Sequence, residues 1–199
     1  MTHAAPERGR RLSPNARREQ ILAAARKLFS ERPWTTVSTA DVAEGAGVAR
    51  SLVHHYFGGI RGVFMAVLAQ GGAALADVRT AGPETPLAER IAFNLSAGLD
   101  VVAENRETWL AVAGHGVTDP EIRSLVDAAR EASIERTLAV MRDVIEDTPA
   151  TRFALRCFND FAAEATREWL AGRVTREETE ALLVASFRAL LLHAIPELE

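Results

Sequence analysis

The spacing of apolar residues restricts the possible folds of this sequence more than any other feature. In one segment after another, apolar side chains recur at intervals of three and four residues, which places them on one face of an α-helix. No segment shows the sustained alternation, rich in Val, Ile and Thr, of a half-buried strand. The sequence therefore predicts an all-α protein. The helical pattern is clearest in the segments 21–29, 63–68, 87–102, 122–129, 158–169 and 183–194.

Proline and glycine divide this pattern into about nine helices. Pro33 ends the first one, because the residue before a proline is disfavoured in the helical conformation. We expect a flexible basic arm over residues 1–14, a small helical domain over 15–60 and a larger helical domain over 61–199. A helix at about residues 60–80 is expected to connect the two domains.

Charge is distributed unevenly along the chain. Residues 1–61 contain ten Lys and Arg and five Asp and Glu, a balance of +5. The remainder contains thirteen and twenty-two, a balance of −9, which together give the net charge of −4. A basic first third on an acidic body indicates that the first segment meets a polyanion.

Several classes of protein are not expected. One cysteine among 199 residues forms no internal disulfide and no zinc cluster. No apolar run approaches the ~18–20 residues of a membrane span, and the polar first 14 residues do not resemble a signal peptide, so we expect a cytoplasmic protein without a membrane partner. Paired carboxylates, a Ser-His-Asp set, a phosphate loop and metal-ligand spacing are all missing, so we expect no enzyme, no cofactor and no metal site.

The segment from Ser38 to Phe57 has the features of a helix-turn-helix. Ser38 and Asp41 have the spacing of a capping box, and Gly47 suits the left-handed turn that ends a short helix. A second short helix follows, with Val53 and Phe57 on its buried side. Such a helix can enter the DNA major groove when its outer face carries hydrogen-bond donors.

The N-terminal quarter resembles the DNA-binding domain of the TetR (tetracycline-repressor-like) family of bacterial transcription regulators. The resemblance implies a homodimer that binds a pseudo-palindromic operator in double-stranded DNA, most often as a repressor released by a small-molecule effector. It also implies a C-terminal helical domain that binds this effector and dimerises through its last two long helices. The residues that carry the resemblance are Ile21–Ala25, Leu28-Phe29, Val42-Ala43, Ala46-Gly47-Val48 and Val53-His54-His55-Tyr56-Phe57.

The resemblance also implies roles for individual residues. Arg50, Ser51 and Leu52 would approach base edges, and Arg50 is the best candidate for a bidentate contact to guanine. Three departures from the family pattern are Pro33 after the first helix, Ala49 at a capping position, and Ile60 where a lysine often contacts phosphate. Arg61 is the candidate to take over that contact. The full set of candidate DNA-binding residues is Ser38, Thr39, Ala49, Arg50, Ser51, Leu52, His54, His55, Tyr56 and Arg61.

The C-terminal part offers candidates for an effector pocket and a dimer interface. Each pocket candidate is aromatic, or polar near an apolar helical face, and ordinary core packing is the alternative for each: Phe93, Asn94, Trp109, His115, Phe158 and Trp169. Cys157 is expected to be a small buried hydrophobe. Dimerisation is expected through the helices at about 150–171 and 175–194, unless both are buried within one subunit. A second face of small residues on the last helix points to this role: Leu182, Ala185, Ser186 and Ala189.

The preferred hypothesis is a dimeric DNA-binding regulator that responds to a ligand. One alternative is a helical small-molecule-binding protein with a vestigial DNA-binding head, which Ala49 and Ile60 support. Another is a regulator of the same fold without a metabolite inducer.

Overall fold

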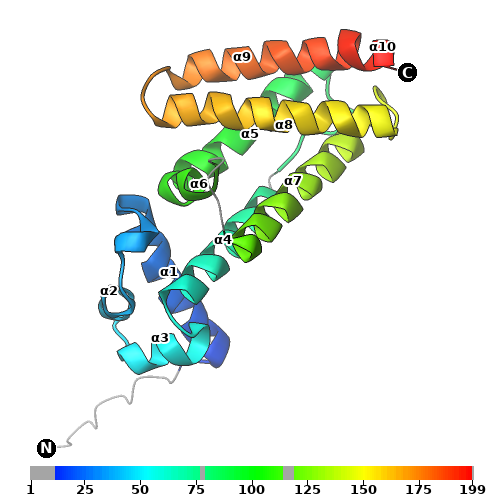
Figure 1. Cartoon of the computed structure of the whole chain (residues 1–199). Coiled ribbons are helices and arrows are strands. Elements are labelled where there is room, and N and C mark those ends of the chain that lie inside the picture. The colour runs from blue at the N-terminus through cyan, green and yellow to red at the C-terminus, as the bar shows by residue number, and fades with distance from the viewer. Residues whose placement is uncertain (1–11, 77–78, 114–118, 199) are drawn as a thin grey trace, which may run out of the picture.

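The computed structural model of the chain is helical, and it describes residues 12–76, 79–113 and 119–198. Over these ranges it contains no strand, so the prediction of an all-α fold is confirmed. Figure 1 shows a small N-terminal group of helices, a long helix leading away from it, and a larger C-terminal group capped by two antiparallel helices.

The N-terminal group consists of α1 (Pro14–Glu31), α2 (Thr39–Gly45) and α3 (Arg50–Phe57). The hydroxyl of Ser13 begins α1 by accepting a bond of 3.2 Å from the backbone N–H of Ala16. The helix ends before Pro33, as predicted, with Arg32 in an extended conformation, and a 3-10 turn (Trp34–Thr36) leads towards α2. The apolar faces of the three helices bury a common core, which includes Ile21, Leu22, Ala25, Phe29, Val42 and Val53.

Helix α4 (Ile60–Ala76) connects the N-terminal group of helices, which we call the head, to the rest of the chain. Its first turns belong to the head, because Val63, Phe64 and Val67 are buried in the same core as α1. The ring of Trp34 stacks on Phe64 at 4.3 Å between centroids. Ile122, from the start of α7, completes this core. The head and the body therefore share buried side chains at α4 and α7.

The C-terminal body contains α5 (Leu87–Glu104), α6 (Arg106–Ala113), α7 (Pro120–Val140), α8 (Pro149–Leu170) and α9 (Arg176–Ala189). A π-helical turn (Leu190–Ala194) and α10 (Ile195–Leu198) continue α9 in nearly the same direction (Figure 1). Helices α8 and α9 lie side by side and cover α5 and α7. The buried residues between them are Ile91, Ile134, Leu138, Met141, Ala154, Leu155, Phe187, Leu191 and Ile195.

A buried charge joins α5 to the end of α7. Arg90 has only 1% of its surface exposed, and its guanidinium donates two hydrogen bonds, of 2.7 and 2.9 Å, to the carboxylate of Asp143. It also donates a bond of 3.0 Å to the carbonyl of Val140. The hydrogen bonds from Arg90 to the Asp143 carboxylate hold the pKa of Asp143 below its usual value. The pair fixes the position of the loop that follows α7.

The continuous helical stretch Arg176–Leu198 is long and apolar enough to cross a membrane by length and composition, contrary to the expectation from sequence. Its inner side packs into the core of the body through Leu183, Phe187, Leu191 and Ile195. Part of the apolar character of this stretch therefore belongs to core packing, and part lies on the outer side of the helix.

Candidate nucleic-acid interface and internal cavity

Helices α2 and α3 form the predicted helix-turn-helix. The Oγ of Ser38 accepts a bond of 3.2 Å from the backbone N–H of Asp41, and the Asp41 carboxylate accepts one of 2.9 Å from the backbone N–H of Ser38. That second bond is the main reason why the pKa of Asp41 lies below its usual value. Gly47 has a φ of 62° in the turn between the helices. The capping box and the left-handed glycine are both confirmed.

Helix α3 turns a polar face outward. Val53 is completely buried beneath it, while Arg50, Ser51, His54 and His55 are exposed. Leu52 and Tyr56 are half-buried at the edges of this face. Ala49 begins the helix without a side-chain cap, as its methyl group requires. The exposed face thus presents donors of the kind that bind base edges and phosphates.

Thr39 holds the side chain of Arg50 in place. Its hydroxyl lies on α2 in a buried position, where it accepts a bond of 3.0 Å from the Nε–H of Arg50. The same oxygen lies 3.4 Å from Nε2 of His54. Because the bond to Thr39 uses Nε, the terminal nitrogens of Arg50 are the ones with which it can approach a base edge. Thr39 therefore restrains the direction of the Arg50 side chain on α3.

Arg61 connects the start of α4 to the start of α7. Its guanidinium donates two hydrogen bonds of 2.9 Å to the carboxylate of Asp119 and forms an ion pair of 2.8 Å with Glu121. The pKa of Asp119 is lowered chiefly by the bonds from Arg61. Asp119 is also the N-cap of α7, accepting bonds from the backbone N–H groups of Glu121 and Ile122. A phosphate contact by Arg61 stays a prediction.

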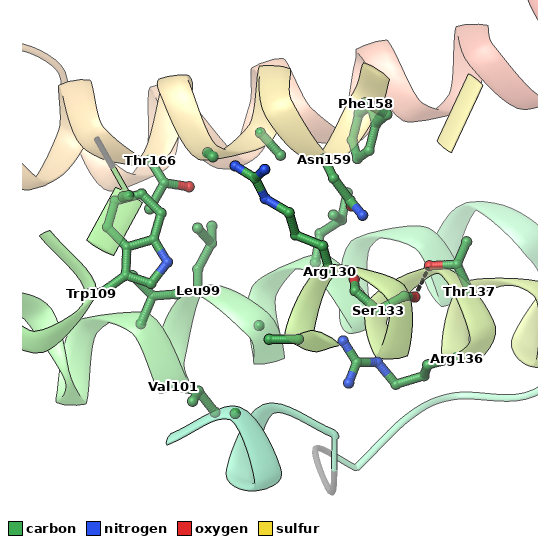
Figure 2. Close-up of a pocket in the computed structure, with 18 of the residues that line it drawn as sticks. Leu99, Val101, Trp109, Arg130, Ser133, Arg136, Thr137, Phe158, Asn159 and Thr166 are labelled. Atoms are coloured by element: carbon green, nitrogen blue, oxygen red, sulfur yellow. Dashed lines mark hydrogen bonds between the residues drawn. The ribbon is translucent and has the colours of Figure 1, made fainter. Parts of the chain in front are cut away.

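A cavity of about 340 Å³ lies in the C-terminal body, with walls from α4 to α9 (Figure 2). Its walls are mainly apolar, with Leu95, Leu99, Val102, Phe158 and Leu183 among them. The polar side chains among the described lining residues are Asn94, Asn105, Thr108, Arg130, Ser133, Arg136, Thr137, Asn159 and Thr166, with the indole of Trp109. This volume and composition are those of a small-molecule site.

The structure brings three of the predicted pocket residues to the cavity: Asn94, Trp109 and Phe158. The amide of Asn94 is engaged with Ala81, through bonds of 2.8 and 3.1 Å to the backbone N–H and carbonyl. Phe93 and Trp169 are not among the lining residues; Phe93 is 43% exposed, and Trp169 packs against a neighbouring cluster of α5, α8 and α9. His115 lies outside the described residues.

Sequence reasoning missed the charged and polar residues that α7 and α8 contribute to the cavity. Arg130, Ser133 and Thr137 follow one another at helical spacing on α7, on the same face as the apolar Val126 and Val140. An arginine that interrupts the apolar face of a helix is a signal that could have found this group. Asn159 and Thr166 of α8 carry no comparable signal.

Helices α8 and α9 also carry an apolar face that a single chain leaves uncovered. We call it the α8–α9 face; it comprises Phe153, Cys157 and Phe161 of α8 with Leu182, Ala185 and Ala189 of α9. Phe153 is 57% exposed and Leu182 is 48% exposed, while Ser186 is half-buried at its border. The prediction that Cys157 is buried is wrong, because α8 has two apolar sides and Cys157 lies on the outer one.

Two family models match the chain. Residues 21–67 match the one described as bacterial regulatory proteins of the tetR family, and residues 87–190 match the one described as the tetracyclin repressor-like C-terminal domain. The second match alone covers more than half of the chain, and the first contains the helix-turn-helix. The chain belongs to the TetR family.

Individual relatives agree with this assignment. The regulator BetI of Brucella anthropi is 33% identical over 116 residues, which are 55% of this chain and 59% of BetI, so the chain spans less than two thirds of these relatives. The activator FasR of Mycolicibacterium smegmatis is 25% identical over 167 residues, 82% of this chain and 76% of FasR. A tetR-family regulator from Streptomyces coelicolor has a similar structure, with a TM-score of 0.81 and 31% identity over 90% of this chain and 82% of that one.

Membership of the TetR family confirms the resemblance seen in the sequence. The relatives BetI and FasR are an HTH-type transcriptional regulator and an HTH-type transcriptional activator.

Proposed function

We propose that this TetR-family chain is a cytoplasmic homodimer that binds a pseudo-palindromic operator through α3 and releases it when a small molecule enters the cavity. The observation that carries the proposal is the exposed polar face of α3, on which the buried Thr39 holds Arg50 by a bond of 3.0 Å. An arginine restrained in this way loses less conformational freedom when it binds a guanine. Ser51 and Leu52 lie beside it for further base contacts.

The α8–α9 face supports the homodimer. The exposed aromatic and aliphatic side chains of these two neighbouring helices mark an interaction surface. Pairing this face with its copy about a two-fold axis would produce a four-helix bundle with both heads on one side. Two α3 helices would then reach successive major grooves, ~34–36 Å apart.

The connection between cavity and head supports the response to a ligand. Helices α4 and α7 both line the cavity, and their first turns belong to the core of the head. The bonds of Arg61 to Asp119 tie these turns together. A ligand that fits the cavity better at one spacing of the two heads would shift the population toward that spacing.

The proposal is tested by DNA binding. Bound duplexes are selected from a fragmented genomic pool at ~150 mM salt, and the best one is titrated with salt. We expect a pseudo-palindrome with a steep salt dependence. Weak binding that does not depend on the DNA sequence would refute the proposal of a specific operator and favour a vestigial DNA-binding head. A bound operator that no cavity ligand releases would favour a regulator without an inducer.

Arg50→Ala tests the residue that carries the proposal. We expect a loss of ~1–3 kcal/mol on the operator, about 5- to 150-fold in affinity, with relaxed specificity at one base pair. Lys27→Ala is the control, because Lys27 is an exposed cation on α1 in the same head; its effect on operator affinity should be small. Equal losses for Arg50→Ala on operator and random duplexes would mean that Arg50 contacts phosphate.

A further inference from the structure

The charged side chains among the described residues that line the cavity all carry positive charge. The described residues that line it include two arginines, Arg130 and Arg136, and no aspartate or glutamate. This is unusual in a body whose charge balance is strongly acidic. A cavity with apolar walls and cationic side chains attracts negative charge, because the walls have a low dielectric constant and screen the field poorly.

Arg130 lines the cavity from α7, and its side chain is 46% exposed. Figure 2 shows its side chain reaching towards α8, with Thr166 on one side and Asn159 on the other. Its ion pairs there are loose, at 3.3 Å from Asp160 and 4.0 Å from Asp127. Both carboxylates are more than 60% exposed, and pairs of this kind contribute at most ~1 kcal/mol. Arg130 can therefore exchange them for a bound anion at little cost.

Arg136 adds a second positive charge from the same helix. It lies less than two turns after Arg130, with Ser133 midway between them, and it extends away from α8 in Figure 2. Its guanidinium is half-buried, and burial lowers its pKa because water solvates the cation less well there. An anion in the cavity would compensate part of this lost solvation.

The rest of the cavity suits an apolar body. Leucine, valine and phenylalanine side chains from α5, α8 and α9 surround the space, and the indole of Trp109 closes one end beside Leu99 (Figure 2). Asn159 and Thr166, both on α8, are neutral hydrogen-bond donors near Arg130, and they can bind the same anionic group as Arg130. Arg130, Asn159 and Thr166 thus form one polar group between α7 and α8, next to these apolar side chains.

We propose that the cavity binds an anionic amphiphile, with an apolar body against α5, α8 and α9 and a single carboxylate-type group against Arg130. Arg136 contributes to the positive field of the cavity from a different side. A guanidinium binds a carboxylate by two parallel charge-assisted hydrogen bonds, which are about twice as strong as neutral ones. This inference rests on the proposed function only in taking the cavity as the effector site.

The test compares three ligands of equal length by isothermal titration calorimetry on the full-length protein without DNA. They are decanoate, which is anionic, decanol, which is neutral, and decyltrimethylammonium, which is cationic, all below their micelle-forming concentrations. We expect decanoate to bind at least about tenfold more tightly than decanol, a difference of ~1.4 kcal/mol, and the cation to bind most weakly. Decyl phosphate is a fourth ligand, which tells whether a phosphate monoester can replace the carboxylate.

Variants locate the anionic group. Arg130→Gln should weaken decanoate at least about tenfold and leave decanol within about twofold, because it removes the charge and keeps most of the side-chain length. Arg136→Gln should weaken decanoate by a smaller factor. Arg142→Gln is the control, because Arg142 is an exposed cation just beyond α7 and does not line the cavity. Arg130 is 46% exposed, so its replacement should leave the fold intact.

Three results would overturn the inference: no decanoate binding by the folded protein, equal or tighter binding of decanol, and equal losses of both ligands in Arg130→Gln. None of them depends on DNA. If decanoate binds as expected but leaves operator affinity unchanged, the anionic site stands and the proposed release mechanism fails. If the operator binds but decanoate does not, the proposed DNA-binding function stands and this inference fails.

Discussion

Replacing Phe153 by serine tests the proposed homodimer most directly. Phe153 lies in the first turns of α8, at one end of the α8–α9 face, and 57% of its surface is exposed in the single chain. With ~200 Å² for a phenylalanine side chain, about 115 Å² would be buried in each subunit when two such faces meet. At ~25 cal/mol per Å² this corresponds to about 3 kcal/mol per subunit, or about 6 kcal/mol for the two copies.

This figure is a ceiling, because association also costs side-chain and rotational freedom. Losing a quarter of this free energy, about 1.5 kcal/mol, still raises the dimer Kd about tenfold, and we expect at least that change for Phe153→Ser. Sedimentation equilibrium over a dilution series measures the Kd. Because the side chain is largely exposed in the monomer, circular dichroism should show an unchanged helical content.

Phe93→Ser is the matched control. Phe93 is also a surface phenylalanine, 43% exposed, but it lies on α5 outside the α8–α9 face. Its replacement should leave the dimer Kd within about twofold. The reasoning is refuted if Phe153→Ser leaves the dimer unchanged, or if Phe93→Ser weakens it as much, since the interface would then lie elsewhere.

Three further predictions concern the head, the Arg90–Asp143 pair of the body, and the connection between head and body. Ser38→Ala should lower stability by ~1 kcal/mol in thermal unfolding, because the capping box of α2 is lost; an unchanged midpoint would contradict this. Asp143→Asn should destabilise the protein at neutral pH and flatten its acid dependence. Arg90 lowers the pKa of Asp143 in the folded protein. The stability from this pair is therefore present above the pKa of Asp143 in the unfolded chain, and it is lost as the pH falls through its pKa in the folded protein. If the free energy of unfolding decreases equally with falling pH in the variant and the wild type, the prediction is wrong. Arg61→Gln should reduce the salt slope of operator binding by ~1 if Arg61 contacts phosphate, while Asp119→Asn keeps the cap of α7 and should not reduce it.

The fold class and the head could be predicted because their signals are local. The capping box of Ser38 and Asp41, the turn at Gly47 and the helix end at Pro33 each depend on residues within a few positions of one another. Interactions over three or four residues are recorded directly in the order of the sequence. The position of Val53 beneath an exposed polar face followed from the same periodicity.

The candidate cavity was only partly predictable. Their aromatic side chains make Trp109, Phe158 and Phe93 candidates for the pocket on sequence alone. Trp109 and Phe158 line the cavity, but Phe93 faces outward. Helical periodicity tells which residues share a face, but it does not tell what that face meets. Asn94 likewise lines the cavity, and its amide is bonded to a loop thirteen residues away, which no local pattern could indicate.

Local sequence patterns are enough to predict the helices, the end of α1 before Pro33 and the polar outer face of α3, because these result from backbone and side-chain interactions within single turns. The packing of the helices, in contrast, is needed to see that Arg130 lines an apolar cavity, that Arg61 binds Asp119 58 positions away, and that Cys157 lies on an uncovered face. Each of these depends on which helices pack together and at what rotation. Packing of that kind is decided by the summed burial of many side chains distant in sequence, so no short segment contains it.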